Sequence, residues 1–490
     1  MLGRHLLYYL PVNAAQAVVG FGSIYVLTRL LSPHDYGLYA LALAATHFAH
    51  VPVFTWLESA AARFHARAQR RGRLADHFAT LFAVWAVAAA GFTLVLALAL
   101  WLLPLPAEIR TLSGFVGAAL IARAAMKLFQ ESRRAAQDAA RYGVLETIYI
   151  LAGFGIGIGF VLGTPLRAAG PFAGLLVAAL VCVLVEAPVM LRRARGGRAQ
   201  TLRAVSYARY GAPLSLSLVM SLIVSVSDRF MIAGFLGEAA AGVYAAGYAL
   251  ADRTLDILFV WVGMAAAPLA VSLFEREGGE SARRALKTQA ETMVLISMPA
   301  AVGLALVAGP LAAVMTGEAF RDQAAHLIPW VAAAGLLGGF TTYYLDQSFE
   351  LTRKTHLIPL VLAAPAAANI VLNLALIPVW GVTGAVVATV CAYAAGAITT
   401  FIVGSRLFAL PLPVGAIVRT AAACAVMAVA VLALPYFGSA WVALLIHAGA
   451  GAIAFAAAAL LLDAGPSRAF ALEALRRVRR LTPPIVEPAR

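Results

Sequence analysis

Residues 29–40 read RLLSPHDYGLYA, and residues 234–245 read GFLGEAAAGVYA. When the two stretches are aligned, four pairs of residues match: Leu31 with Leu236, Gly37 with Gly242, Tyr39 with Tyr244, and Ala40 with Ala245. Each stretch lies between two long apolar segments. The repeat predicts an internally duplicated membrane protein, an organisation typical of transporters that hold their substrate between two halves.

The composition also indicates a membrane protein, because 62% of the residues are hydrophobic and only 12% are charged. Soluble domains carry about 25% charged residues. Apolar stretches long enough to cross a hydrocarbon core of about 30 Å recur along the chain, and we expect helices because they satisfy their own backbone polar groups. We predict fourteen spans, at about 10–31, 38–60, 78–103, 112–132, 143–163, 171–191, 211–236, 240–270, 289–314, 327–350, 357–378, 381–404, 416–436 and 440–463.

The repeat defines the expected fold class, an all-α integral membrane protein of about 14 transmembrane helices. Six spans in each copy form a lobe, and the even number predicts a parallel repeat about a pseudo-two-fold axis along the membrane normal. Two extra C-terminal helices have no counterpart. The predicted parts are an N-lobe (1–195), a C-lobe preceded by a basic linker (196–410), two additional spans (411–463) and a basic tail (464–490).

The basic charge is a signal of topology. The net charge is +14, and most of the 37 Lys and Arg residues fall in alternate loops starting from the N-terminus. The intervening loops hold only Arg29, Arg110, Arg167 and Arg321. This bias predicts that both termini are cytoplasmic and that the basic loops touch anionic membrane lipids. No basic soluble module is present, so nucleic-acid binding is not expected. Residues 467–481 could form an amphipathic helix on the inner leaflet or a solvated basic tail.

Several functional classes lack their motifs in this sequence. No lysine follows a glycine, so the phosphate loop of nucleotide-driven pumps is absent. His47 and His50 stand three residues apart without an evident third ligand, which favours a polar lining or a helix contact over a metal site. No catalytic constellation is visible. We therefore expect no enzyme activity, no cofactor and no bound metal.

Charged residues inside the predicted spans are the candidate functional residues, because a charge at bilayer depth costs free energy unless it is paired or hydrated. The bases, which are candidates for substrate binding, are Arg123, Lys127, Arg229 and Arg253. The acids, which are candidates for ion coupling or for pairing, are Glu58, Asp228, Asp252, Asp256 and Asp346, with Glu350, Glu146 and Glu186 near them or near span ends.

Two interpretations of the bases stay open. They could line a hydrated cavity that accepts an anionic headgroup such as a lipid-linked diphosphate, which suits the planar donor fork of arginine. Alternatively they serve the structure. In that case Arg229 would pair with a carboxylate of another helix, and Arg253 with Asp252 or Asp256, while Arg123 and Lys127 would snorkel toward the cytoplasmic surface.

Three passages together resemble the polysaccharide-biosynthesis flippases, the O-antigen and exopolysaccharide unit translocases of bacteria. The passages are TRLLSPHDYGLYALA (28–42), SDRFMIAGFLGEAAAGVYAAGYALADR (227–253) and NIVLNLALIPVWGVTGAVVATVCAY (369–393). The wider superfamily contains multidrug antiporters and peptidoglycan-precursor flippases. Arg229 and Arg253 fall in the second passage, whereas Arg123 and Lys127 are candidates by their chemistry alone.

The resemblance implies an inner-membrane flippase that works by alternating access. Its cargo would be an undecaprenyl-diphosphate-linked oligosaccharide, moved from the cytoplasmic to the periplasmic leaflet, and a polysaccharide polymerase and chain-length machinery are its implied partners. Glu58, Asp228 or Asp346 could couple a proton or Na⁺. Two alternatives remain: a multidrug cation antiporter on the same scaffold, and an accessory subunit of a polysaccharide assembly machine that transports nothing.

Overall fold

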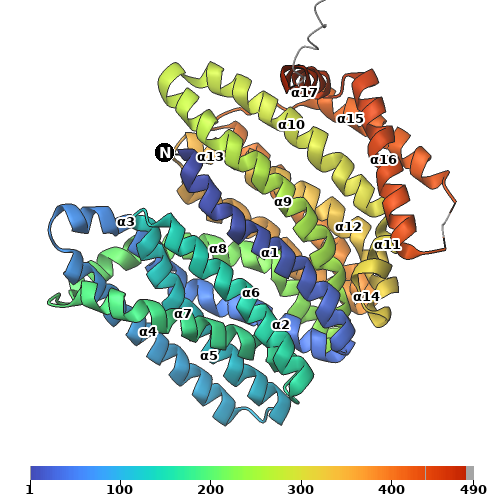
Figure 1. Cartoon of the computed structure of the whole chain (residues 1–490). Coiled ribbons are helices and arrows are strands. Elements are labelled where there is room, and N and C mark those ends of the chain that lie inside the picture. Colours follow the sequence, from blue (N-terminus) through green and yellow to red (C-terminus); the bar gives the residue numbers. More distant parts are fainter. Residues whose placement is uncertain (1, 436–437, 482–490) are drawn as a thin grey trace, which may run out of the picture. The chain divides into compact units, whose positions relative to one another are not determined.

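The structure, a computed structural model, describes the backbone of residues 2–435 and 438–481, and these residues form helices and turns without any strand (Figure 1). The predicted all-α class is confirmed. Each of the fourteen predicted spans is largely helical, although 38–60, 289–314 and 327–350 are each divided between two α-helices. Residue 436, at the end of one span, lies outside the described residues. The predicted tail beyond residue 481 also lies outside them.

Seventeen α-helices are labelled in chain order in the described part of the sequence. Their bounds are α1 Leu2–Leu30, α2 Pro33–His50, α3 Trp56–Arg70, α4 Leu74–Leu102, α5 Ala107–Ala135, α6 Ala139–Gly163, α7 Gly170–Ala194, α8 Thr201–Leu236, α9 Glu238–Glu277, α10 Gly279–Leu306, α11 Ala308–Met315, α12 Arg321–Phe340, α13 Gln347–Leu351, α14 Ile358–Ser405, α15 Val414–Leu432, α16 Ala440–Leu462 and α17 Ser467–Leu481.

Several helices differ from the predicted spans in length or continuity. The long polar connections are partly helical, because α8, α9 and α10 continue beyond the apolar core into them. Two predicted spans, 357–378 and 381–404, form the single helical run α14, which is interrupted only at Gly381 with φ 59°. The helix predicted at 467–481 is present as α17, and its position on a membrane leaflet stays a prediction.

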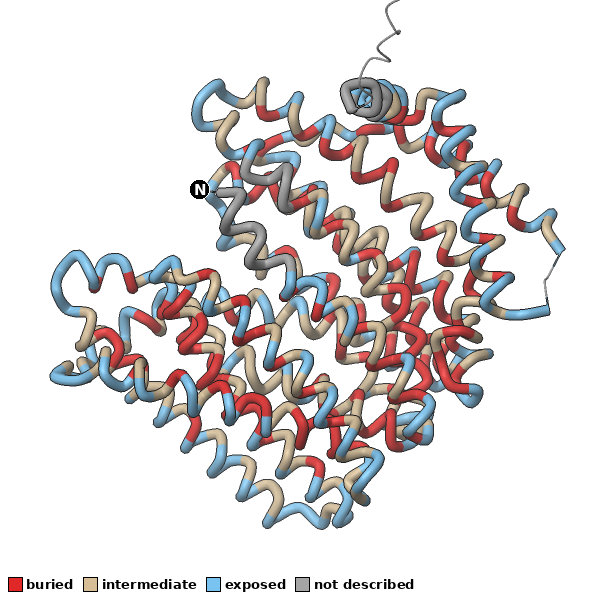
Figure 2. Tube along the Cα trace, viewed as in Figure 1, coloured by how far each residue is buried: buried red, intermediate tan, exposed pale blue. Residues whose placement is uncertain are grey.

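Surface composition agrees with a membrane location. Eleven helical stretches of the described residues are long and apolar enough to cross a membrane. Exposed positions run along helices such as α4 and α16 (Figure 2), and they include Val87, Trp101 and Leu461, which are 75%, 79% and 79% exposed. Large apolar side chains in such numbers on the surface are expected where the solvent is lipid.

The chain divides into two compact units. Unit 1 contains the chain up to Gly247 together with residues 315–323 and 362–392, and unit 2 contains 248–314, 324–361 and the chain from 393 onward. Helices α9 and α14 therefore contribute to both. The lobe boundaries near residues 195 and 410, which follow from the sequence repeat, stay a prediction.

In unit 1, α6 and α7 pack along each other, α1 packs on α6, and α5 packs on α7 (Figure 1). Helix α8 joins this bundle through contacts with α2, α3 and α4. In unit 2, α15 and α16 form a helical pair that packs on α10, and α17 follows α16. Each unit is thus a helical bundle with its own buried side chains.

The two copies of the repeated turn meet inside unit 1. Ser32 caps α2, with its Oγ accepting a hydrogen bond from the Asp35 backbone N–H at 3.1 Å. The backbones of the two copies are in contact at Gly37 and Gly242. A Cβ on Gly37 would overlap the carbonyl oxygen of Glu238, and a Cβ on Gly242 would overlap the carbonyl oxygen of Pro33. The absence of a side chain at both positions therefore permits the close approach of the two backbones.

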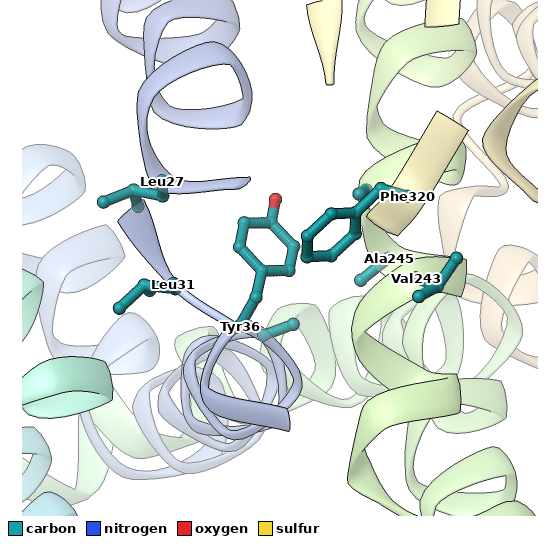
Figure 3. Packing of buried hydrophobic residues seen from close by; sticks show 8 residues of the cluster. Leu27, Leu31, Tyr36, Val243, Ala245 and Phe320 are labelled. Carbon is teal, nitrogen blue, oxygen red and sulfur yellow. The ribbon is translucent and has the colours of Figure 1, made fainter. Parts of the chain in front are cut away.

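An apolar cluster surrounds this contact between the copies. Tyr36 packs edge-on against Phe320 at a ring-centroid distance of 5.4 Å, and Val243 and Ala245 come from the second copy (Figure 3). The Gly317 backbone N–H donates to Thr28 Oγ1 at 2.9 Å, which joins residues 315–323 to the end of α1. We refer to the end of the unit 1 helices at these turns as the repeated-turn end.

Candidate functional site

Charged and polar side chains from three helices of unit 1 come together within the membrane-crossing segments. His47 on α2 lies within electrostatic range of Lys127 on α5 and of Arg229 on α8. The side chain of His47 is exposed, whereas those of Lys127 and Arg229 are half-buried. We name these three residues the Lys127–Arg229 cluster. The structure therefore brings together two of the four bases predicted to bind substrate.

A π-helical turn shapes the edge of this cluster. It covers Val51–Thr55, includes Pro52 and joins α2 to α3. Such turns are frequent at functional sites because they shift the side chains that follow them. Here the turn places His50 Nε2 2.9 Å from Glu58 Oε1, in a buried ion-pair contact that lacks the geometry of a hydrogen bond.

Arg123, the third predicted base, is bound to a carboxylate. Its two terminal nitrogens donate to the two Glu146 oxygens at 2.9 and 2.6 Å, and Gln130 Nε2 donates to Glu146 at 2.7 Å. The guanidinium also lies 4.1 Å from the Tyr149 ring centroid. Bidentate pairing and ring stacking hold Arg123 in place. Its contacts are those of internal pairing and not of a side chain that reaches for the membrane surface.

Lys127 has a different environment from Arg123, although it follows on the same helix. Among the described residues it makes no hydrogen bond and no ion pair, even though it lies in the membrane-crossing helix α5. A charged side chain at bilayer depth costs about 2.5–3.5 kcal/mol at the helix centre. An unpaired ammonium group in such a position indicates contact with water or with an anionic ligand.

Asp228 occupies a second site in unit 1 and is 0% exposed. Its carboxylate accepts hydrogen bonds from the Tyr244 hydroxyl, from the Arg229 backbone N–H at 2.8 Å and from Thr389 Oγ1 at 3.4 Å. Tyr244 belongs to the second copy of the repeated turn. Three hydrogen bonds hold this buried carboxylate in place.

Two buried asparagines of α14 lie beside the Asp228 helix. Asn369 Oδ1 accepts from Ser227 Oγ at 3.1 Å and from Asn373 Nδ2 at 3.1 Å. Asn369 Nδ2 and Asn373 Oδ1 are buried without a hydrogen-bond partner among the described residues. Unsatisfied polar atoms of this kind are the places where water or an ion is expected to bind. We name Asp228, Thr389, Asn369 and Asn373 the Asp228 pocket.

The remaining predicted site residues lie in unit 2. Arg253 on α9 is half-buried and makes no ion pair or hydrogen bond with a described residue. Asp256 is exposed and accepts a hydrogen bond from the Tyr343 hydroxyl at 3.3 Å. Asp346 follows a second π-helical turn, Thr341–Leu345, and is half-buried within electrostatic range of Glu350. Asp252 is half-buried on α9 next to Arg253.

Glu186 is part of a fully paired network in unit 1. Its Oε2 accepts from Arg133 Nε at 2.9 Å and its Oε1 from Arg141 Nε at 2.5 Å, while Arg133 also donates to Asp138 at 3.0 Å. We name these four residues the Glu186 network. Both carboxylate oxygens and the buried guanidinium are satisfied, so the network supports the packing of α5, α6 and α7.

Sequence reasoning missed several polar residues of the site. Neither Glu146, as the partner of Arg123, nor Gln130 and Tyr149 beside it, was expected. Tyr244, Thr389 and the two asparagines were also not singled out, although Asn369 and Asn373 stand in the passage that carried the family resemblance. Two asparagines four residues apart in an apolar helix are a signal that could have found the pocket. The described residues contain no group of three His, Cys, Asp or Glu side chains able to hold a metal ion.

Comparison with solved structures shows that the chain has the fold of known multi-pass membrane transporters. The chain is similar to the lipid II flippase MurJ in an inward closed conformation, with a TM-score of 0.73 and 12% identity over 93% of this chain and 98% of that one. It is also similar to a multidrug resistance MATE family transporter of the MOP superfamily, inward-facing, with a TM-score of 0.59 and 14% identity over 78% and 94% of the two chains. The Vibrio cholerae MATE transporter VcmN has a TM-score of 0.52 and 15% identity over 82% and 97%.

The sequence assigns the chain to a protein family, which is a narrower class than the fold. A family model described as "polysaccharide biosynthesis protein" matches residues 26–325, and the chain belongs to this family. The match covers both copies of the repeated turn and the Lys127–Arg229 cluster. A comparison with curated protein sequences finds no match. The family description names polysaccharide biosynthesis, and the solved structures that share the fold are a lipid II flippase and multidrug transporters.

Proposed function

We propose that this protein is a flippase that moves a lipid-linked oligosaccharide with an anionic phosphate headgroup from one membrane leaflet to the other. The observation that carries the proposal is the Lys127–Arg229 cluster, in which Lys127 of a membrane-crossing helix makes no ion pair or hydrogen bond with a described residue and, like Arg229 of another helix, lies within electrostatic range of His47. Membership of a polysaccharide biosynthesis family supports a saccharide cargo.

The chemistry of the cluster suits a phosphate headgroup better than a neutral sugar or a cationic drug. Arg229 offers a planar fork of donors, and Lys127 offers a point charge from a neighbouring helix. Both are cationic side chains and would attract an anion into the bundle. Polar sugars could then cross the apolar core only inside the protein, while the lipid tail stays in the bilayer.

Transport would occur by alternating access. The two lobes predicted from the repeat would rock so that the headgroup site opens first to one leaflet and then to the other. The contact between Gly37 and Gly242 at the repeated-turn end would close one side of the site in this conformation. Separation of the two turns would then open that side.

We propose that the energy comes from a proton or Na⁺ bound at the Asp228 pocket. The pocket combines a buried carboxylate with hydroxyl and amide oxygens, which are the ligand types of hard cations. Asp228 precedes Arg229 directly, so an ion bound to the carboxylate would change the field at the headgroup site. Glu58 and Asp346 are further candidates for this role, the first through its contact with His50.

The finer details follow the family resemblance and are part of the proposal. The cargo would be undecaprenyl-diphosphate-linked and would move from the cytoplasmic to the periplasmic leaflet of a bacterial inner membrane, with both termini of the protein in the cytoplasm. A polysaccharide polymerase and chain-length machinery would act on the product. The cargo would serve O-antigen or exopolysaccharide synthesis.

A second candidate function is a multidrug cation antiporter. The observation in its favour is the acidic character of unit 2, where Asp346 and Glu350 lie in a membrane-crossing stretch and Asp252 and Asp256 lie on α9. Such carboxylates would attract cationic drugs. The bases of unit 1 favour an anion instead, and the two functions differ in the sign of the cargo charge.

The proposed function is tested in liposomes that contain the purified protein and a fluorescent polyprenyl-diphosphate oligosaccharide. Transfer between leaflets is measured by the access of a membrane-impermeant quencher, under a proton gradient, a Na⁺ gradient or a membrane potential. Arg229→Ala, Arg253→Ala and Lys127→Gln are compared with the wild type. Arg283→Gln is a matched control, because Arg283 is an exposed base of α10 whose contacts are an ion pair with Glu280 and a position 5.0 Å from the Phe408 ring centroid.

Transfer by the wild type and by Arg283→Gln, with loss in Lys127→Gln or Arg229→Ala at unchanged folding, is the expected result. The absence of wild-type transfer under every gradient would overturn the flippase assignment. Gradient-driven export of a cationic dye by the same liposomes would then favour the antiporter. Inactivity toward both substrates would favour the accessory subunit.

A further inference from the structure

Unit 1 contains an apolar groove that no part of the proposed function uses. Its volume is about 390 Å³, within the range of about 300–1,000 Å³ that is typical of small-molecule sites. Helices α2, α4 and α5 form its walls, and Phe230 of α8 and Glu238 of α9 complete it. Ser113 and Glu238 are the only polar residues in a lining of fifteen. We name it the unit 1 groove.

The groove runs along the bundle and one end reaches the Lys127–Arg229 cluster. On α2 its lining extends from Leu38 to Ala49, a rise of about 16 Å at 1.5 Å per residue. Its other end lies at Glu238, near the repeated turn. At the cluster end, the lining residue Phe230 follows Arg229 in sequence, and the lining residue Ala49 lies two residues after His47.

We propose that the unit 1 groove holds the hydrocarbon tail of the lipid whose anionic headgroup binds the Lys127–Arg229 cluster. This inference rests on the proposed function, and it adds a tail subsite to the headgroup site. The occupant is one molecule of amphipathic lipid, with its charged group at the basic end of the groove and its chain along the apolar walls.

Charge and polarity along the groove support this occupant. An apolar groove among membrane-crossing helices has no water to fill it, and a hydrocarbon chain is the chemically matched occupant. A phosphate group matches the charges of Lys127 and Arg229 at one end. A lipid whose headgroup is bound at the cluster would have its tail beside the groove. A fully polar ligand would not match the apolar walls of the groove, and a cationic ligand would not match the basic cluster.

The position of the groove also gives it a function in transport. It occupies the half of unit 1 between the cluster and the repeated-turn end. A lipid tail held there lies along the helices in the leaflet on that side. Tail binding would therefore favour the state in which the headgroup has reached the cluster, and it would make long tails better substrates than short ones.

The test uses two fluorescent diphosphate-linked saccharides that differ only in their tails, one of two or three isoprene units and one of eleven. Ala45 lines the groove and is exposed, so Ala45→Trp fills the groove without disturbing a packed core. Ala86→Trp is the matched control, because Ala86 is an exposed alanine of α4 outside the groove lining. Half-saturating concentrations for leaflet transfer are measured for both probes.

In the wild type we expect the long-tailed probe to be transferred with a half-saturating concentration at least about tenfold lower than the short-tailed one, because the longer tail makes more van der Waals contacts with the groove walls. Ala45→Trp should remove most of this difference by weakening the long probe alone, and Ala86→Trp should leave it unchanged. An unchanged preference for the long tail in Ala45→Trp would overturn the proposal.

Photo-crosslinking gives a second measurement that does not depend on a folded variant. A long-tailed probe with a diazirine in its tail is bound to the wild-type protein, irradiated and mapped by mass spectrometry. Labelling of α2 or α5 between residues 38–49 or 109–120 that a non-photoactive long-tailed probe competes away would support the tail subsite. Competition by bulk phospholipid alone, or labelling only elsewhere, would overturn it.

These outcomes separate the groove from the proposed function. If the wild type transfers neither probe, the flippase assignment fails and the groove proposal fails with it. If the wild type transfers both probes equally well and Lys127→Gln abolishes transfer, the headgroup site stands and only the tail subsite is wrong.

Discussion

Unit 1 contains two groups of charged residues in membrane-crossing helices, and they differ in how their charges are satisfied. In the Glu186 network, both carboxylate oxygens contact arginines at 2.9 and 2.5 Å, and Arg133 is shared with Asp138. In the Lys127–Arg229 cluster, both bases lie within electrostatic range of His47, and Lys127 makes no ion pair or hydrogen bond with a described residue. The Glu186 network stabilises the fold, whereas the Lys127–Arg229 cluster is the proposed binding site for an anionic ligand.

The largest predicted effect on stability is in the Glu186 network. Glu186→Gln removes the charge that two arginines share and leaves Arg133, which is 8% exposed at its side chain, without its main partner. Breaking a buried ion pair from one side costs about 3–5 kcal/mol. We expect unfolding in detergent at a clearly lower denaturant concentration. An unchanged midpoint would contradict the view that this network is structural.

Glu146→Gln should have the next largest effect. It weakens the bidentate contact to Arg123, and losing charge-assisted hydrogen bonds costs about 1.5–3 kcal/mol. Because Arg123 is then released within the bundle, the variant also shows whether this base can serve transport. The unfolding midpoint and cargo transfer are measured together, with Gln130→Ala as a control that removes only a neutral donor to Glu146. If Glu146→Gln and Gln130→Ala are equally stable, the charge of the pair is unimportant.

Lys127→Gln should show the opposite pattern. Since the ammonium group has no partner among the described residues, we expect the unfolding free energy to change by no more than about 0.5 kcal/mol. Loss of a contact to an anionic headgroup is worth about 1.5–3 kcal/mol, so the half-saturating cargo concentration should rise roughly 10- to 150-fold. Lys127→Arg should restore most of the affinity. A strongly destabilised Lys127→Gln protein would assign the lysine to the fold instead.

Arg283→Gln is expected to have the smallest effect. Its contact with Glu280 at 3.3 Å is exposed, and such pairs contribute less than about 1 kcal/mol and often nothing measurable. Stability and transfer should both match the wild type within error. A marked loss of transfer here would show that total basic charge, and not the position of the bases, determines activity.

The positions of the helices were largely predictable from the sequence, because hydropathy reports directly on bilayer depth. The predicted span 440–463 nearly coincides with α16, and the break expected between two spans after residue 378 appears at Gly381 within α14. The π-helical turn at Val51–Thr55 was not predictable, since hydropathy does not distinguish one helical hydrogen-bond pattern from another.

The interaction partners of the charged residues were harder to predict than the positions of these residues along the membrane-crossing helices. Arg123 and Lys127 stand four residues apart with the same chemistry, yet only Arg123 meets a carboxylate. The difference arises from Glu146 on α6, and the pairing of α5 with α6 is a property of the packed bundle. The Asp228 pocket likewise needs residues from three helices. The sequence identified Asp228 but not the hydroxyl and amide groups around it.

The most direct test of the central claim is the dependence of transfer on headgroup charge. Liposomes with wild-type protein or Lys127→Gln are given two lipids with the same tail and sugar, one linked by a diphosphate and one by a neutral ether. The account predicts that the wild type transfers the diphosphate lipid at least about tenfold more efficiently, and that Lys127→Gln loses most of this preference. Equal transfer of both lipids by the wild type, or an unchanged preference in the variant, would contradict it.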